Sequence, residues 1–143
     1  MSFKRKEGKH DVKYFKRKAS TALTNGAVVN VDSNGYLIQG TASSVNHVGI
    51  YIGYTVASTD SDYASTPFVP VDMAGPTDLF IADVSAGTVA QTAVGAYYDL
   101  NSTGTSVDLS ATSVKAVYVQ DILSATSQVV VLINSMAGVD ETG

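Results

Sequence analysis

The sequence predicts an all-β fold, a small antiparallel β-barrel or β-sandwich preceded by an extended basic N-terminal arm. Three observations lead to this prediction. Short β-rich runs follow one another closely, clusters of Gly, Asn, Asp and Ser separate them, and no helical periodicity lies between them. The chain of 143 residues has the size of one domain. We therefore expect an arm over residues 1–25 and one β domain over residues 26–143.

Nine β-rich runs are expected in the body of the chain. Alternating apolar residues mark some of them, and the run at 114–123 is apolar on both faces, which is typical of a strand that is covered on both sides. The expected strands cover residues 27–31, 36–39, 48–56, 68–71, 79–84, 94–100, 106–109, 114–123 and 128–134.

Turn residues support these boundaries. Asn25-Gly26, Asn34-Gly35 and Thr103-Gly104 supply residues that tolerate positive φ, as tight turns require. The three prolines, at 67, 70 and 76, predict an edge strand or an ordered loop instead of a central strand. Residues 57–67 form the longest expected surface loop.

Charge is distributed very unevenly along the chain. Eight of the nine Lys and Arg residues lie in residues 1–18, where two acids offset them, and the other 125 residues hold one cation and eleven acids. The two parts therefore carry net charges of +6 and −10. Such an asymmetry indicates interaction with a partner. No apolar run approaches the roughly 20 residues of a membrane-spanning helix.

The residues give little support to catalysis. NVDSNGYL, residues 30–37, imitates the start of a calcium loop, but Thr41 stands where a bidentate Glu is needed, so we expect a tight turn capped by Asp32 and no metal. The chain has no cysteine. Of its two histidines, His10 lies in the arm, and His47 is expected to be a surface or interface residue. We therefore expect neither an enzyme nor a cofactor.

The arm is the predicted partner-binding site. Three functions are open from its residues: a nucleic-acid tail, a membrane-surface helix, or a docking arm for an acidic protein surface. The apolar stripe is too small for more than marginal membrane anchoring. The tyrosines of the body are not expected to stack on nucleic acid, because the body carries a charge of −10 that would repel a phosphate backbone. The predicted binding residues are Lys4, Arg5, Lys6, Lys9, Lys13, Tyr14, Phe15, Lys16, Arg17 and Lys18.

Residues 26–134 resemble the capsid decoration, or cement, proteins of tailed bacteriophages. The similarity lies in GTASSVNHVGIYIG, FVPVDMAGPTDLFIADVSAGTVAQTAVGAYYDL and SVKAVYVQDILSATSQVVVLIN, which supply a V-G-I strand, a G-A-Y-Y-D strand and a closing V-V-V-L strand. The basic arm has no counterpart in that pattern. The resemblance implies a β-tulip-like domain on the outer surface of the virion capsid, forming a homotrimer at three-fold positions and binding the major capsid protein.

On this basis we expect a structural protein that cements a capsid, with the arm gripping the capsid surface. Two alternatives stay open. One is a phage fibre or tail module that contacts a host surface through loop 57–67, and the other is a nucleic-acid binder that uses the basic arm.

Overall fold

The computed structural model describes residues 1–134, in which the chain forms eleven β-strands, two short 3-10 helices and no α-helix. The all-β class is therefore confirmed. The strands are β1 (Phe3–Glu7), β2 (Val12–Lys16), β3 (Val28–Val31), β4 (Leu37–Gln39), β5 (His47–Tyr51), β6 (Phe68–Met73), β7 (Leu79–Ala86), β8 (Tyr97–Leu100), β9 (Val107–Asp108), β10 (Val117–Leu123) and β11 (Gln128–Ile133), and the 3-10 helices are η1 (Gln91–Ala93) and η2 (Ser124–Thr126).

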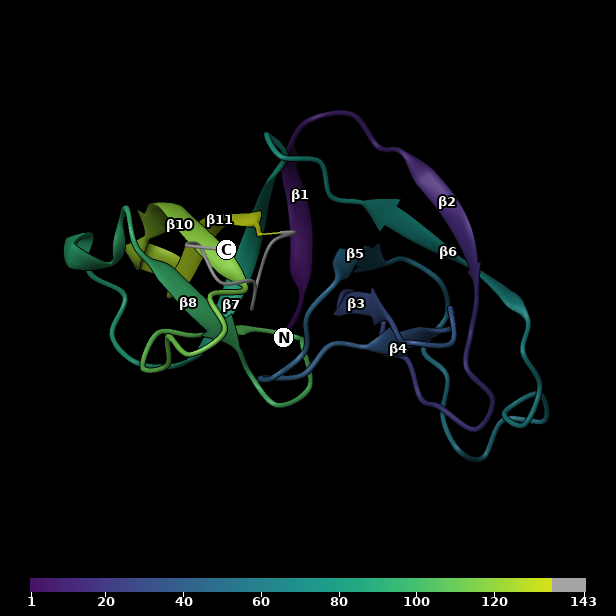
Figure 1. Ribbon diagram of the computed structural model, residues 1–143. Helices are drawn as coiled ribbons and strands as arrows, with labels where there is room; N and C mark the ends of the chain where they lie inside the picture. Colours follow the sequence, from purple (N-terminus) through teal and green to yellow (C-terminus); the bar gives the residue numbers. More distant parts are fainter. Residues whose placement is uncertain (135–143) are drawn as a thin grey trace.

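The first sheet has the strand order β1-β7-β11-β10-β8-β9, and a further pairing of β9 with β7 closes five of these strands into a barrel. Strand β7 makes this possible because its eight residues serve three neighbours. One edge pairs with β11, and the other edge is shared by β1 and by the parallel strand β9. Figure 1 shows β1 standing between this barrel and the rest of the molecule.

The second sheet has five strands in the order β2-β6-β5-β3-β4, all antiparallel to their neighbours. It curls until its two outer strands touch at one point. There Arg17, which follows β2, forms a parallel bridge with Leu37 at the start of β4, and the Lys18 N–H donates to the Leu37 carbonyl at 3.1 Å. In Figure 1, β2 and β6 run side by side along the outside of this sheet.

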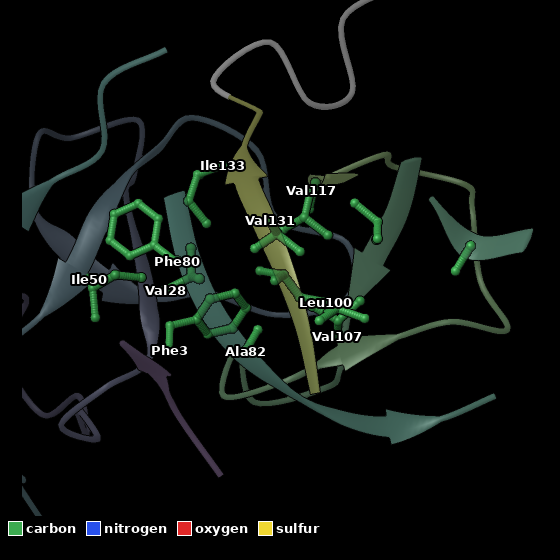
Figure 2. Packing of buried hydrophobic residues seen from close by; sticks show 14 residues of the cluster. Phe3, Val28, Ile50, Phe80, Ala82, Leu100, Val107, Val117, Val131 and Ile133 are labelled. Atoms are coloured by element: carbon green, nitrogen blue, oxygen red, sulfur yellow. The ribbon is translucent and has the colours of Figure 1, made fainter. Parts of the chain in front are cut away.

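Side-chain alternation divides the interior into two hydrophobic clusters. Val28 of β3 and Ile50 of β5 belong to the first cluster, together with Phe3 and Phe80 from the first sheet (Figure 2). The neighbouring residues of the same two strands, such as Val29, belong to the second cluster inside the curled sheet. The second sheet therefore packs one face on the first sheet and uses the other face for a core of its own.

Each of the nine strands expected in the body is present, with ends that shift by a few residues. The N-terminal segment differs from the prediction of an arm that extends from the body. Residues 3–7 pair with β7 in the first sheet, and residues 12–16 pair with β6 in the second. Phe3 is buried in the first cluster, and Phe15 packs against the second. The segment carries inward-facing residues among its lysines, so it completes both sheets.

The prolines also depart from expectation, because Pro70 lies in β6, between β2 and β5. The missing N–H is tolerated because β5 pairs with β6 only as far as Tyr51, which lies opposite Val71. The Ile52 N–H donates to the Pro70 carbonyl, so the Pro70 nitrogen faces the side on which β5 has already ended.

The predicted turn between residues 30 and 37 is confirmed as a hairpin. Strands β3 and β4 pair antiparallel on either side of it, and Gly35 adopts a φ of +85°. The Asp32 Oδ1 atom accepts hydrogen bonds from the N–H groups of Asn34 and Tyr36, both at 2.9 Å. The Asp32 carboxylate thus caps the turn as expected.

The burial of Phe3 gives the first testable prediction. Phe3 is 4% exposed, so Phe3→Ala should lower the free energy of unfolding by about 3 kcal/mol, because it removes a ring from the shared core. Tyr14→Ala is the matched control, since Tyr14 is 65% exposed and should cost less than about 1 kcal/mol. Urea denaturation measures both; equal losses would show that β1 does not contribute to the core.

Candidate functional site

The cations of the N-terminal segment separate into two kinds. Six lysines are exposed: Lys4, Lys6, Lys9, Lys13, Lys16 and Lys18. The two arginines instead point into the molecule. Arg17 is 0% exposed, and the side chain of Arg5 is 5% exposed. The predicted binding residues therefore include two that the fold itself uses, and the basic surface is made of lysines.

Arg5 joins the two sheets through a buried ion pair. From β1, its Nε donates to Asp72 Oδ2 at 3.0 Å and its Nη2 donates to Asp72 Oδ1 at 2.9 Å, so β6 of the second sheet is held by a two-pronged contact. Nη2 also donates to the Met73 carbonyl at 2.7 Å, and Nη1 lies 3.1 Å from Asp78 Oδ2. The guanidinium carbon lies 4.9 Å from the centre of the Phe80 ring.

Further groups complete the surroundings of Asp72. His10 places Nδ1 2.8 Å from Asp72 Oδ2, although the His10 side chain is 70% exposed. Burial alone would raise the pKa of Asp72, but hydrogen bonds from Arg5 and His10 outweigh burial and hold the pKa below its usual value. Gly49 of β5 lies so close to the Asp72 backbone that a side chain there would collide with it.

An unpartnered mixed surface lies on the outer side of β2 and β6. We name it the β2–β6 face and define it by Val12, Tyr14, Lys16, Phe68 and Pro70. Tyr14 is directly opposite Pro70, and Lys16 is directly opposite Phe68, so these side chains share one side of the sheet. Tyr14 and Phe68 are 65% and 64% exposed, and the Lys16 ammonium lies 5.6 Å from the Phe68 ring centre.

Three further exposed lysines of the N-terminal segment are only weakly engaged within the chain. Lys6 lies 3.5 Å from Glu7, Lys13 lies 3.7 Å from Asp11, and Lys18 lies 4.0 Å from Asp32. Each of these lysine side chains is at least 41% exposed, and ion pairs this open to water contribute little. Their charge is therefore available to a partner.

Two further candidates are His47 and the acidic side chains that could hold a metal ion. His47 is buried, contrary to the expected surface or interface position, and its Nε2 lies 2.9 Å from the Ser44 hydroxyl. Burial lowers the pKa of His47 to about 4, and a hydrogen bond with the Asn134 backbone acts weakly in the opposite direction. Among residues 1–134, no three His, Asp or Glu side chains are grouped closely enough to hold a metal ion.

Sequence reasoning did not identify Phe68, Asp72 or Asp78 as site residues. Phe68 begins the FVPVDM strand, and its alternation with Val69 could have indicated an outward aromatic residue. The two aspartates carry no local signal, because they lie in the middle of the chain and meet Arg5 only in the folded protein.

Comparison with protein-family models finds no match to this chain, and no curated protein matches it. Within the part of the chain that the structure describes, no helix is both long enough and apolar enough to cross a membrane.

The ion pair predicts a specific acid sensitivity. The pKa of Asp72 is lower in the folded protein than in the unfolded chain, so its contribution to stability is present above about pH 4 and is lost as the pH falls through the folded value. Asp72→Asn should lower the free energy of unfolding by about 3 kcal/mol at pH 7, and the deficit should shrink below pH 4. Chemical denaturation of both proteins at several pH values measures this difference in the free energy of unfolding.

Asp11→Asn serves as the control for this measurement, because the Asp11 side chain is 64% exposed and 3.7 Å from Lys13. Its effect should stay within about 0.5 kcal/mol. A deficit for Asp72→Asn that is the same at pH 3 and pH 7 would contradict the ion-pair account.

His47 predicts a separate loss of stability in milder acid. The folded pKa of about 4 lies below the ordinary value near 6.5, so the unfolded chain takes up the proton first as the pH falls. The free energy of unfolding should therefore drop between pH 6.5 and pH 4, by about 3 kcal/mol in total. In His47→Gln this drop should be absent. A drop of the same size in the variant would show that another group causes it.

Proposed function

We propose that this protein is a structural decoration protein that cements the outer surface of a tailed-phage capsid as a homotrimer. The β2–β6 face and the surrounding lysines grip the major capsid protein. The observation that carries this proposal is the β2–β6 face itself, where Tyr14 and Phe68 expose most of their surface beside Lys16. The resemblance of residues 26–134 to decoration proteins supplies the biological setting.

The chemistry of the face suits a protein partner. Aromatic side chains are enriched at the centres of protein interfaces, and charged groups are commoner at their rims. Here two aromatic residues and Pro70 lie among lysines, which supports docking on a surface that is apolar in the middle and acidic around it. Burial of Tyr14 and Phe68 would supply affinity, and the lysines would supply steering and register.

The free edge of β2 adds a second means of attachment. In the sheet order β2 is the outermost strand, so along residues 12–16 its second edge has no strand of residues 1–134 beside it. A partner strand could extend the sheet there through backbone hydrogen bonds, with side-chain pockets setting the specificity. Lysines along such an edge also discourage unwanted pairing, which suits a strand that is reserved for one partner.

The charge distribution supports self-association beside capsid binding. The exposed cations of residues 1–18 are six lysines, and eleven of the thirteen acids lie in the rest of the chain, so the basic surface of one copy can complement acidic residues of another. Contacts of this kind run head to tail and close into a ring when the rotation allows it, as in a trimer. A protein that binds only the assembled shell stabilises it by mass action.

The test is binding to capsids of the virus that encodes the chain. Phe68→Ala and the pair Lys13→Glu/Lys16→Glu should each weaken co-sedimentation with capsids by about tenfold or more, and the charge-reversal variant should also lose much of the salt dependence of binding. Substitution is preferable to deletion of the segment, because deletion removes one strand from each sheet.

Tyr97→Ala is the matched control, since Tyr97 is 40% exposed and lies in the barrel, on β8. Its binding should equal that of the unaltered protein, and sedimentation velocity on the same samples reports whether a trimer forms. Unchanged capsid binding by both face variants would overturn the proposal. Salt-sensitive binding to DNA would favour the nucleic-acid function, and binding to host cells would favour a fibre or tail module.

A further inference from the structure

A groove of about 660 Å³ opens at one end of the second sheet. Its walls come from the end of β5 and the residues after it, from the start of β6, and from Arg17 beside β2. Tyr54, which is 95% exposed, lies on one wall, and Pro67, Phe68 and Pro70 lie on another. The volume falls in the range typical of small-molecule sites, and the lining is mainly apolar and aromatic.

Arg17 brings a positive charge to this groove, where Asp62 also belongs to the lining but forms no ion pair with it. Its Nη2 donates to two backbone carbonyls of the loop 57–67, that of Asp62 at 2.7 Å and that of Ser65 at 3.3 Å. Its Nε and Nη1 are fully buried and have no hydrogen-bond partner within residues 1–134. Nor does any carboxylate of that part of the chain lie within 4.0 Å of the guanidinium.

Comparison with Arg5 shows how unusual this arrangement is. The Arg5 guanidinium binds two carboxylates and two backbone carbonyls, and its Nε is fully used. A guanidinium has five N–H donors, and the two carbonyls can take only the two on Nη2 of Arg17, which leaves three without an acceptor. Buried donors without partners are rare and costly, and the penalty is greater for a charged group. The bonds to the loop account for the burial of Nη2 of Arg17, but they give no reason for the burial of Nε and Nη1.

The aromatic groups around Arg17 do not supply the missing acceptor. The Tyr51 hydroxyl donates its proton to the Tyr54 carbonyl. Burial raises the pKa of the Tyr51 hydroxyl, the positive charge of Arg17 acts in the opposite direction, and the negative charge of Asp62 raises it further. The Tyr51 hydroxyl therefore stays neutral, and an anion from outside the chain is the group that best matches the three free donors.

We propose that this groove binds a small aromatic carboxylate, whose carboxylate accepts hydrogen bonds from Nε and Nη1 of Arg17 and whose ring packs against Tyr54, Phe68 and the prolines. To reach these donors the ligand displaces part of the exposed loop 57–67, which Arg17 ties down through the two carbonyls. The inference does not depend on the proposed capsid function, because it rests on the buried guanidinium and the groove alone.

The chain allows a direct test, because Arg5 and Arg17 are its only arginines. Their Nε–H groups give two NMR signals, which Arg17→Lys assigns. Titration of the full-length protein with phenylacetate should shift the Arg17 signal in a saturable manner and leave the Arg5 signal unchanged. Phenylacetamide, which has the same shape and no charge, should bind about tenfold or more weakly, because a charge-assisted hydrogen bond is lost.

A second variant keeps the test decisive if Arg17→Lys does not fold. Tyr54→Ala removes an exposed ring from the groove wall and should weaken phenylacetate binding about threefold or more, whereas Tyr97→Ala in the barrel should have no effect. In that case the Nε–H signal that shows through-space contacts with the Phe80 ring belongs to Arg5, and the other signal belongs to Arg17. Equal binding of the acid and the amide, or no saturable shift at all, would overturn the proposal.

Discussion

The contact between Arg5 and Asp72 is the constraint on which the rest of the structure depends. It connects β1, in the sheet that forms the barrel, with β6, in the curled sheet, through two nearly equal hydrogen bonds. Because both side chains are almost completely buried, the pair is stable only in a narrow geometry. Arg5 therefore fixes how the two sheets sit against each other, and Asp78 and the Phe80 ring hold its guanidinium in place.

The placement of β1 has a consequence for the surface as well. With Phe3 and Arg5 facing inward, the intervening Lys4 and the following Lys6 are exposed. The same alternation in β2 sends Phe15 towards the second core and leaves Tyr14 and Lys16 on the β2–β6 face. The alternation of side chains along a strand thus places apolar residues of β1 and β2 in the interior and lysines of the same strands on the surface.

The body strands could be predicted from the sequence because apolar runs and turn residues mark them locally, as the Asp32-capped hairpin illustrates. The strands β1 and β2 could not, since the inward Phe3 and Phe15 are surrounded by lysines whose charge dominates the pattern. Arg5 and Asp72 lie 67 residues apart, so no local signal reveals their pairing. His47 opens a strand, but the sequence does not say which side of that position is covered.

The use of the two kinds of cation follows their chemistry. A guanidinium is planar and weakly hydrated, so it suits the buried contacts of Arg5 and Arg17, while the strongly hydrated ammonium groups of the lysines remain in water. The cations of the N-terminal segment therefore do not act together as one mobile basic tail. Its two arginines belong to the framework, and its lysines belong to the surface.

The pairing of β1 with β7 and of β2 with β6 also determines the order of events during synthesis. The ribosome releases the first sixteen residues early, yet the strands that receive them emerge only after residue 67 and residue 78. The second sheet cannot be completed before residue 73, and the first sheet cannot be completed before residue 133. Such distant pairings form slowly. Charged side chains discourage unwanted strand pairing, so the lysines that serve the finished surface also suit a segment whose partner strands have not yet been made.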